Sequence, residues 1–379
     1  MNQNPLELAK PTLIASAVDR AGFDIGWDHA HHGLVPPAEL LHPGTPVCHG
    51  WTAAKAVFGC RTLSASRRTR LWLQLRLLAW RRGLAFDTQQ VTPNYLGQIE
   101  VDLCPIRRVP LGGAAGQADA AVVERLNPQA GYAAGNLATM SAAAAAAREG
   151  IDCQQAVRQA RLAEQTGAPV RGLGAAAWWR LAALLALATP LPFAEVARLP
   201  LAVLPPNRVR LLNAAQGLQA LVTQMFAAPG WSARCRNFAQ WLPEHTLRHD
   251  FNLFIGAMAP RALEAASHPG GPRAGLEDAW LQERVQRRWQ HFVLSLGEDA
   301  TACLLERAAG APVAGKRVLC HAPEQATEGW ALPPPRPPLP LARSRGILVP
   351  HGARLLKPAR PPSSRPGTIP PPGVPTTHA

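Results

Sequence analysis

Residues 151–310 form a long segment in which stretches typical of α-helices alternate with prolines. Apolar residues there follow a helical pattern almost throughout, and prolines together with a PGGP turn interrupt it. We expect helices near residues 173–188, 207–226, 245–257, 276–296 and 298–309. This segment therefore predicts a mostly α protein, with its scattered tryptophans as core residues.

The end of the chain has a different composition. Residues 331–379 contain 15 prolines, seven basic residues and no acidic residue. Such a sequence buries too little apolar surface to fold. We expect a disordered, basic, proline-rich tail.

Composition divides the remaining sequence into three regions. Residues 1–96 are expected to form a mixed, helical N-terminal region, 97–150 combine short β-type runs with an alanine tract, and 151–330 form the α-helical domain. A chain of 379 residues is long enough for two compact domains.

The first region contains one strong helix signal. Leu71, Leu75 and Leu78 are spaced as one apolar stripe, and Ser64 or Ser66 can cap the start of a helix that ends before Gly83. Arginines flank the stripe. The helix either lies along a phosphate backbone or has an ordinary solvated basic face.

Arginine dominates the charge of the chain. The formal net charge is +14, and four of the 39 basic residues are lysines. Guanidinium groups bind phosphate bidentately, so nucleic acid, above all DNA, is the expected partner. A GC-rich genome that encodes arginine by default is the alternative explanation.

Several features point to a cytoplasmic protein without a membrane partner. No apolar run reaches the ~20 residues that a membrane span needs, and the N-terminus does not have the pattern of a signal peptide. The seven cysteines are scattered without a C-x-x-C pair, so we expect reduced thiols that mostly pack as small hydrophobic residues.

The segment from Cys104 to Gly150 is the most informative. Residues 121–126 are typical of a strand, Asn127-Pro128 and Gly135-Asn136 of turns, and Leu137 begins a run of high helix propensity. Here the chain resembles the HNH branch of the His-Me finger endonucleases, in which a β-hairpin and a helix hold one divalent cation. The residues that match the pattern are Cys104, Pro105, Leu111, Val123, Glu124, Arg125, Pro128, Gly131, Tyr132, Gly135, Asn136, Leu137, Met140 and Ser141.

The resemblance implies a small ββα element and a set of site residues. Glu124, Arg125 and Asn136 fall at catalytic positions, with Glu124 as a ligand for Mg²⁺ or Zn²⁺ and Asn136 fixing the loop. Arg107, Arg108, Arg125 and Tyr132 are the candidate contacts to nucleic acid. Arg125 either binds the scissile phosphate or forms a salt bridge, and Tyr132 either packs the loop or stacks on a base or sugar.

Two departures from the family pattern weaken the prediction of catalysis. Arg125 stands where relatives have the general base, and an arginine neither accepts a proton near neutral pH nor binds a cation. Ala145 stands where the helix should supply a second ligand. One carboxylate is too few for Mg²⁺.

A histidine-rich stretch could compensate for these losses. His29, His31 and His32 lie beside Asp24 and Asp28, and could bind a metal or supply the base. A polar loop or a helix end with solvated imidazoles is the alternative.

Two functions thus remain in competition. One is a nucleic-acid-binding protein on an HNH-like scaffold, with metal-dependent phosphodiester hydrolysis either retained or lost. The other is a non-enzymatic helical interaction protein in which the HNH-like element is a structural remnant.

Overall fold

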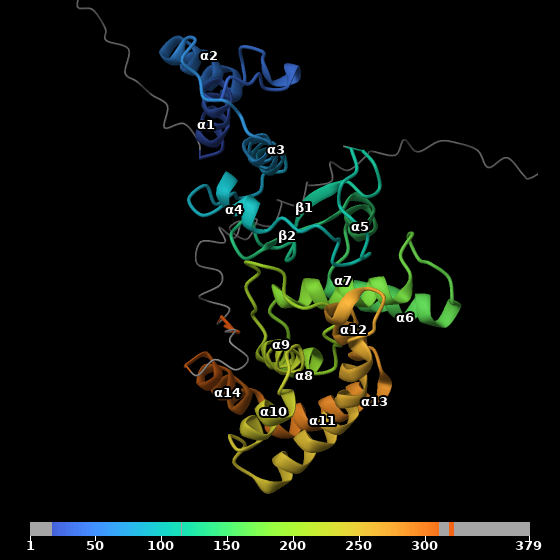
Figure 1. Ribbon diagram of the computed structural model, residues 1–379. Coiled ribbons are helices and arrows are strands. Elements are labelled where there is room, and N and C mark those ends of the chain that lie inside the picture. Colours follow the sequence, from blue (N-terminus) through green and yellow to red (C-terminus); the bar gives the residue numbers. More distant parts are fainter. Residues whose placement is uncertain (1–16, 115, 311–317, 322–379) are drawn as a thin grey trace, which may run out of the picture. The chain divides into compact units, whose positions relative to one another are not determined.

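The computed structural model describes residues 17–114, 116–310 and 318–321 (Figure 1). Over these residues the fold is mostly helical, with one two-stranded antiparallel sheet, as the sequence predicts. Helices long and apolar enough to cross a membrane are absent from this part of the chain. The predicted disordered tail, residues 331–379, lies outside the described residues.

The elements of the first 150 residues are α1 (Ala17–His31), η1 (Ala38–Leu40), α2 (Pro46–Phe58), α3 (Arg67–Arg81), α4 (Pro93–Gln98), β1 (Ala121–Arg125), β2 (Leu137–Ser141) and α5 (Ala142–Arg148). The helical half that follows consists of α6 (Cys153–Thr166), α7 (Ala175–Leu187), α8 (Phe193–Val196), α9 (Ala214–Phe226), α10 (Trp231–Ala239), α11 (His245–Ala265), α12 (Gly271–Ala279), α13 (Glu283–Leu296) and α14 (Glu298–Gly310).

Two glycines let α1 and α2 cross in backbone contact. A Cβ atom on Gly26 would lie 2.0 Å from the carbonyl oxygen of Val47, and one on Gly50 would lie 1.9 Å from that of Phe23. Real carbon atoms do not approach so closely, so a side chain at either position would force the helices apart. The crossing buries Ile25 and Val47 against Leu77 of α3.

Helix α3 confirms the strong helix signal in the sequence. The Ser66 hydroxyl accepts a hydrogen bond from the Thr69 amide at 3.1 Å, and Gly83 follows the helix with φ +63°. Leu75 of the predicted stripe is buried toward α4 and the sheet. Leu77 is buried on a second face, toward α1 and α2, which the single stripe did not predict. Helix α3 thus joins the N-terminal pair to the sheet.

The sheet separates two hydrophobic clusters. Strands β1 and β2 pair antiparallel, and Glu124 lies opposite Ala138. Val123 and Leu137 pack on the face toward α3 and α4, whereas Ala138 and Met140 pack on the other face, in the large core that α7 shares. Side chains that alternate along a strand face opposite sides, so Glu124 lies on the opposite side of the sheet from Val123.

The start of the predicted helix at Leu137 is wrong. Residues 137–141 form β2, and α5 begins at Ala142, where the Ser141 hydroxyl caps it by accepting from the Ala144 amide at 3.3 Å. Every residue of β2 is buried. Pairing with β1 and burial on both faces outweigh the local helix propensity.

The prediction of tryptophans as core residues of the helical half is confirmed for three of them, whereas Trp179, Trp231 and Trp241 are half-buried. Trp178, Trp280 and Trp289 are fully buried, and the rings of Trp280 and Trp289 meet edge to face with centroids 5.2 Å apart. Phe254 contacts both of these rings, at 5.6 and 5.3 Å.

Three of the predicted helices in this half have different bounds. The helix expected at 207–226 begins at Ala214, because Arg208 has a left-handed backbone conformation and Leu211 forms a β-bridge with Cys320. The helix expected at 276–296 is two helices, α12 and α13, because the chain turns after Trp280, whose Nε1 donates to Thr223 at 2.8 Å. The helix expected at 245–257 continues through Pro260 to Ala265.

Candidate functional site

The ββα element places Glu124 of β1 against Arg148 of α5. Arg148 Nη1 donates to Glu124 Oε2 at 3.3 Å, and its Nη2 donates to the carbonyl oxygen of Leu126 at 3.2 Å. The Arg148 side chain is 10% exposed and that of Glu124 is 22% exposed. Burial lowers the pKa of the Arg148 guanidinium, and the charge of Glu124 opposes that shift.

A cavity of about 750 Å³ opens beside this ion pair. Its walls come from the end of β1, the following loop, α5 and the turn after α5, and Arg82 adds an exposed arginine from the end of α3. Ala145, one helical turn before Arg148, also lines it and carries no donor or acceptor in its side chain. The lining combines Arg82, Arg125 and Arg148 with three acids, Glu124, Glu149 and Asp152. The guanidinium of Arg148 lies against Glu124, where the resemblance implies a cation.

The side chain of Arg125 forms hydrogen bonds to the backbone of the loop that follows it. Its Nη1 donates to the carbonyl oxygens of Pro128 and Ala130, at 2.8 and 2.7 Å. Its guanidinium also lies over the Tyr132 ring, 5.3 Å from the centroid. These contacts fix the loop, a role that differs from both predicted ones, the phosphate contact and the salt bridge.

Asn136 has the predicted structural role. Its Oδ1 accepts from the Asn127 amide at 2.8 Å, and its Nδ2 donates to the carbonyl oxygens of Asn127 and Gly131 at 3.1 and 3.0 Å. The residue is fully buried. It therefore holds the loop together, which is the role that the resemblance implies for this position.

Tyr132 cannot be the stacking platform proposed as one of its roles. It is fully buried and packs parallel to Phe86, with ring centroids 6.0 Å apart. Burial raises the pKa of its hydroxyl, and the charge of Glu124 adds to that effect. The loop-packing alternative is the one the structure supports.

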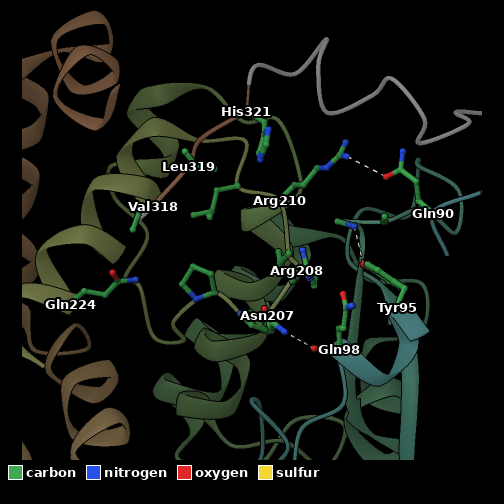
Figure 2. Close-up of a pocket in the computed structure, with 16 residues that line it drawn as sticks. Gln90, Tyr95, Gln98, Asn207, Arg208, Arg210, Gln224, Val318, Leu319 and His321 are labelled. Carbon is green, nitrogen blue, oxygen red and sulfur yellow. Dashed lines mark hydrogen bonds between the residues drawn. The ribbon is translucent and has the colours of Figure 1, made fainter. Parts of the chain in front are cut away.

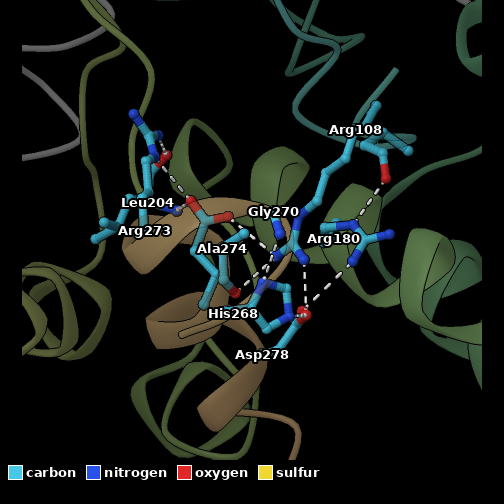
Figure 3. A network of polar contacts seen from close by, with 10 residues as sticks. Arg108, Arg180, Leu204, His268, Gly270, Arg273, Ala274 and Asp278 are labelled. Carbon is cyan, nitrogen blue, oxygen red and sulfur yellow. Dashed lines mark hydrogen bonds and ion pairs between the residues drawn. The ribbon is translucent and has the colours of Figure 1, made fainter. Parts of the chain in front are cut away.

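Arg108 is also a structural residue (Figure 3). Its guanidinium pairs with Asp278 at 2.7 Å and with Glu277 at 3.2 Å, both on α12. Arg180 of α7 reaches the same Asp278 and donates to the Ile106 carbonyl oxygen at 2.7 Å. These acids hold the guanidinium of Arg108 in the contact between the ββα region and α12, and a role in nucleic-acid binding stays a prediction. The neighbouring Arg107 is half-buried and makes a long contact of 3.5 Å with the Ala118 carbonyl oxygen.

The three histidines lie at the end of α1 and in the turn after it. His29 is buried, and its Nδ1 lies 2.7 Å from the Ile25 carbonyl oxygen. The ring of His31 stacks on Phe58 at 4.4 Å, and Asp28 pairs with Arg76. Burial lowers the pKa values of His29 and His32. These are the contacts of a packed helix end.

The predicted metal ligands do not form a set. In the part of the chain that the structure describes, no three His, Cys, Asp or Glu side chains lie close enough together to hold a metal ion. His29, His31 and His32 are thus not grouped with Glu124, which the guanidinium of Arg148 engages. The residues around the ββα element do not fit Mg²⁺ or Zn²⁺.

No family model, curated protein or solved structure matches this chain.

Two residues of the cavity, Arg148 and Arg82, were not predicted. Arg148 follows Ala145 by one helical turn, so a search of the same helix face would have found it. Arg82 is one of the arginines that flank the apolar stripe of α3, and its place in the same cavity as Glu124 depends on how α3 packs on the sheet.

Proposed function

We propose that this protein binds double-stranded DNA through arginines around its ββα element and does not cleave it. The observation that carries the proposal is the bond between Arg148 and Glu124. The guanidinium that neutralises this carboxylate stands where the resemblance implies a cation, but it activates no water for hydrolysis, as a bound cation would.

Exposed arginines of α3 support the binding part of the proposal. Arg67 and Arg70 line a second cavity of about 600 Å³, to which the start of β1 contributes Ala121. Arg82 lines the cavity at the end of β1. At a rise of about 1.5 Å per residue, the backbone from Arg67 to Arg82 extends about 22 Å. That length covers several phosphates of a duplex, whose charges are spaced about 1.7 Å apart along the axis.

The measurement for this proposal is fluorescence anisotropy of a labelled duplex, with the full-length protein at about 50 to 200 mM salt. We expect affinity to fall steeply with salt. Changing Arg67, Arg70 and Arg82 together to Gln should lower affinity more than about tenfold and reduce the salt slope by about 2 to 3, since each phosphate contact contributes about 0.9.

A matched variant controls for net charge. Arg284, Arg287 and Arg288 are exposed on α13, so changing all three to Gln removes the same charge far from β1 in the sequence. This control should leave affinity and salt slope nearly unchanged. Equal losses in both variants would show that binding depends on net charge and not on these arginines, which would overturn the proposed site. Absence of DNA binding by the unmodified protein would overturn the proposal in favour of a non-enzymatic interaction protein.

A further inference from the structure

A separate cavity of about 600 Å³ lies where the ββα element meets the helical half (Figure 2). We call it the Arg210 pocket. One side is formed by α4 and the turn at Gly135, and the other by the segment 205–211, α9 and residues 318–321. Ligand cavities for small molecules are of this size, about 300–1,000 Å³.

The charged side chains that line the Arg210 pocket are all basic. These are Arg208 and Arg210, and the described lining includes no acidic residue. Burial lowers the pKa of His321, so this third basic residue of the lining is neutral near pH 7. Arginines in the interior have acidic partners: Arg108 and Arg180 share Asp278, and Arg148 has Glu124. Among the described residues, the Arg210 guanidinium makes a single long contact of 3.5 Å, to the Gln90 side chain. Two arginines without an acidic partner in a concave site favour an anionic ligand.

The walls of the pocket are tied together by hydrogen bonds. The Arg210 amide donates to the Gly135 carbonyl oxygen at 3.1 Å, and the Asn207 side chain donates to the Gln98 carbonyl oxygen at 2.7 Å. A Cβ on Gly135, whose φ is +96°, would lie 2.4 Å from Arg210 Cγ, so only glycine permits this approach. The two walls are therefore held in place before a ligand arrives.

Arg208 adds a backbone observation. It has φ +66°, a left-handed conformation that is costly for a residue with a side chain. Strained residues of this kind concentrate at ligand sites, where the surrounding structure holds them in place.

Neutral hydrogen-bonding groups complete the lining. The Tyr95 hydroxyl accepts from the Gly135 amide at 2.9 Å, which leaves its own hydrogen to donate. Gln224 Oε1 is buried and has no hydrogen-bond partner among the described residues. Figure 2 shows Gln224 on one side of the pocket, with Tyr95 and Gln98 on the other. A buried acceptor without a partner is costly, so a ligand that donates to it gains affinity.

We propose that the Arg210 pocket binds a nucleoside phosphate, with the phosphate held by Arg208 and Arg210. The amide side chains, Gln224 among them, then bond to the donor and acceptor edge of the base. Inorganic phosphate alone would satisfy the arginines but would leave Gln224 Oε1 without a donor. This site is separate from the DNA-binding surface proposed above, so either can fail without the other.

Isothermal titration calorimetry of the full-length protein tests the proposal, with AMP, ADP, pyrophosphate and inorganic phosphate as probes. ADP should bind at least about tenfold more tightly than pyrophosphate, because the base contributes hydrogen bonds. Changing Arg208 and Arg210 together to Gln should weaken ADP binding at least about tenfold. The double change to Lys should recover part of the loss.

Two further variants give the controls. Arg284→Gln with Arg288→Gln removes two exposed arginines on α13 and should leave ADP affinity unchanged. Gln224→Leu should weaken ADP but leave pyrophosphate unaffected, and it keeps the proposal testable if the arginine variants do not fold. Absence of ADP binding, equal affinity for ADP and pyrophosphate, or an equal loss in the α13 control would each overturn the proposal.

Discussion

Arg148 Nη1 lies 3.3 Å from Glu124 Oε2, so an arginine of α5 neutralises the carboxylate that β1 contributes to the cavity. The sequence resemblance implies a cation at this place, held by ligands from a strand and a helix. Here the helix supplies the positive charge itself. The same pair stabilises the ββα element, and its energetics can be measured independently of any ligand.

Removing Glu124 should expose the energetic cost of a buried, unpaired guanidinium. We expect Glu124→Gln to lower the free energy of unfolding by about 1 to 3 kcal/mol, because Arg148 keeps only a carbonyl partner in a largely buried site. Glu124→Gln combined with Arg148→Met should recover part of that loss. Urea unfolding of Glu124→Gln, Arg148→Met and the double variant measures the coupling. As a control, Glu283→Gln breaks an exposed pair on α13 and should cost less than about 1 kcal/mol. Strictly additive losses at Glu124 and Arg148 would contradict the pairing.

The loop after β1 should depend on Asn136. Asn136→Ala removes three hydrogen bonds in a fully buried site, so we expect a loss of about 2 to 4 kcal/mol in unfolding free energy. Asn237→Ala, at an exposed position on α10, should change it by less than about 0.5 kcal/mol. Thermal or urea unfolding distinguishes the two. A small effect at Asn136 would show that the loop is held by other contacts.

His29 should make the N-terminal helices less stable in mild acid. Burial lowers the pKa of His29 below the ordinary value of 6.5. At a pH between the two pKa values, the unfolded chain therefore binds a proton at His29 and the folded chain does not. The contribution of neutral His29 to the free energy of unfolding should therefore be complete above about pH 7. It should be lost as the pH drops through 6.5 toward the lower pKa of the folded state. Melting temperatures of the wild type and His29→Gln at pH 7.5 and 5.5 provide the comparison. The variant should lose less stability between the two pH values, and equal losses would contradict this role of His29.

The cysteines should divide into reactive and inert groups. Burial raises the pKa of Cys153 to about 12 and that of Cys235 to about 11, and Cys104 is buried as well. Cys60 and Cys303 are exposed. Because the thiolate is the nucleophile, iodoacetamide at pH 8 should label Cys60 and Cys303 rapidly, and the buried thiols only after unfolding. Peptide mass spectrometry assigns the labels. Fast labelling of Cys153 in the folded protein would contradict its burial.

Local signals were sufficient to predict several elements. The cap at Ser66, the stripe with Leu75 and the glycine at position 83 define α3 within one stretch of sequence. The role of Asn136 is local as well, because its partners lie within nine residues of it.

Features that depend on tertiary contacts were not predictable in this way. Residues 137–141 have high helix propensity but form a strand, because β1 pairs with them and both faces are covered. The sequence near Arg108 indicates a phosphate contact, because its acidic partners lie on α12, about 170 residues later in the chain. The Arg210 pocket likewise joins α4 to residues 318–321, and no local pattern connects these segments.

The most direct test of the account is a plasmid-nicking assay under conditions in which DNA is bound. Supercoiled plasmid is incubated with the full-length protein and Mg²⁺, Mn²⁺ or Zn²⁺, while binding is followed in parallel by gel shift. The account predicts a shift of the plasmid without conversion to the nicked or linear form, because Arg148 engages Glu124 and Ala145 offers no ligand. Metal-dependent nicking that disappears in Glu124→Ala would contradict it.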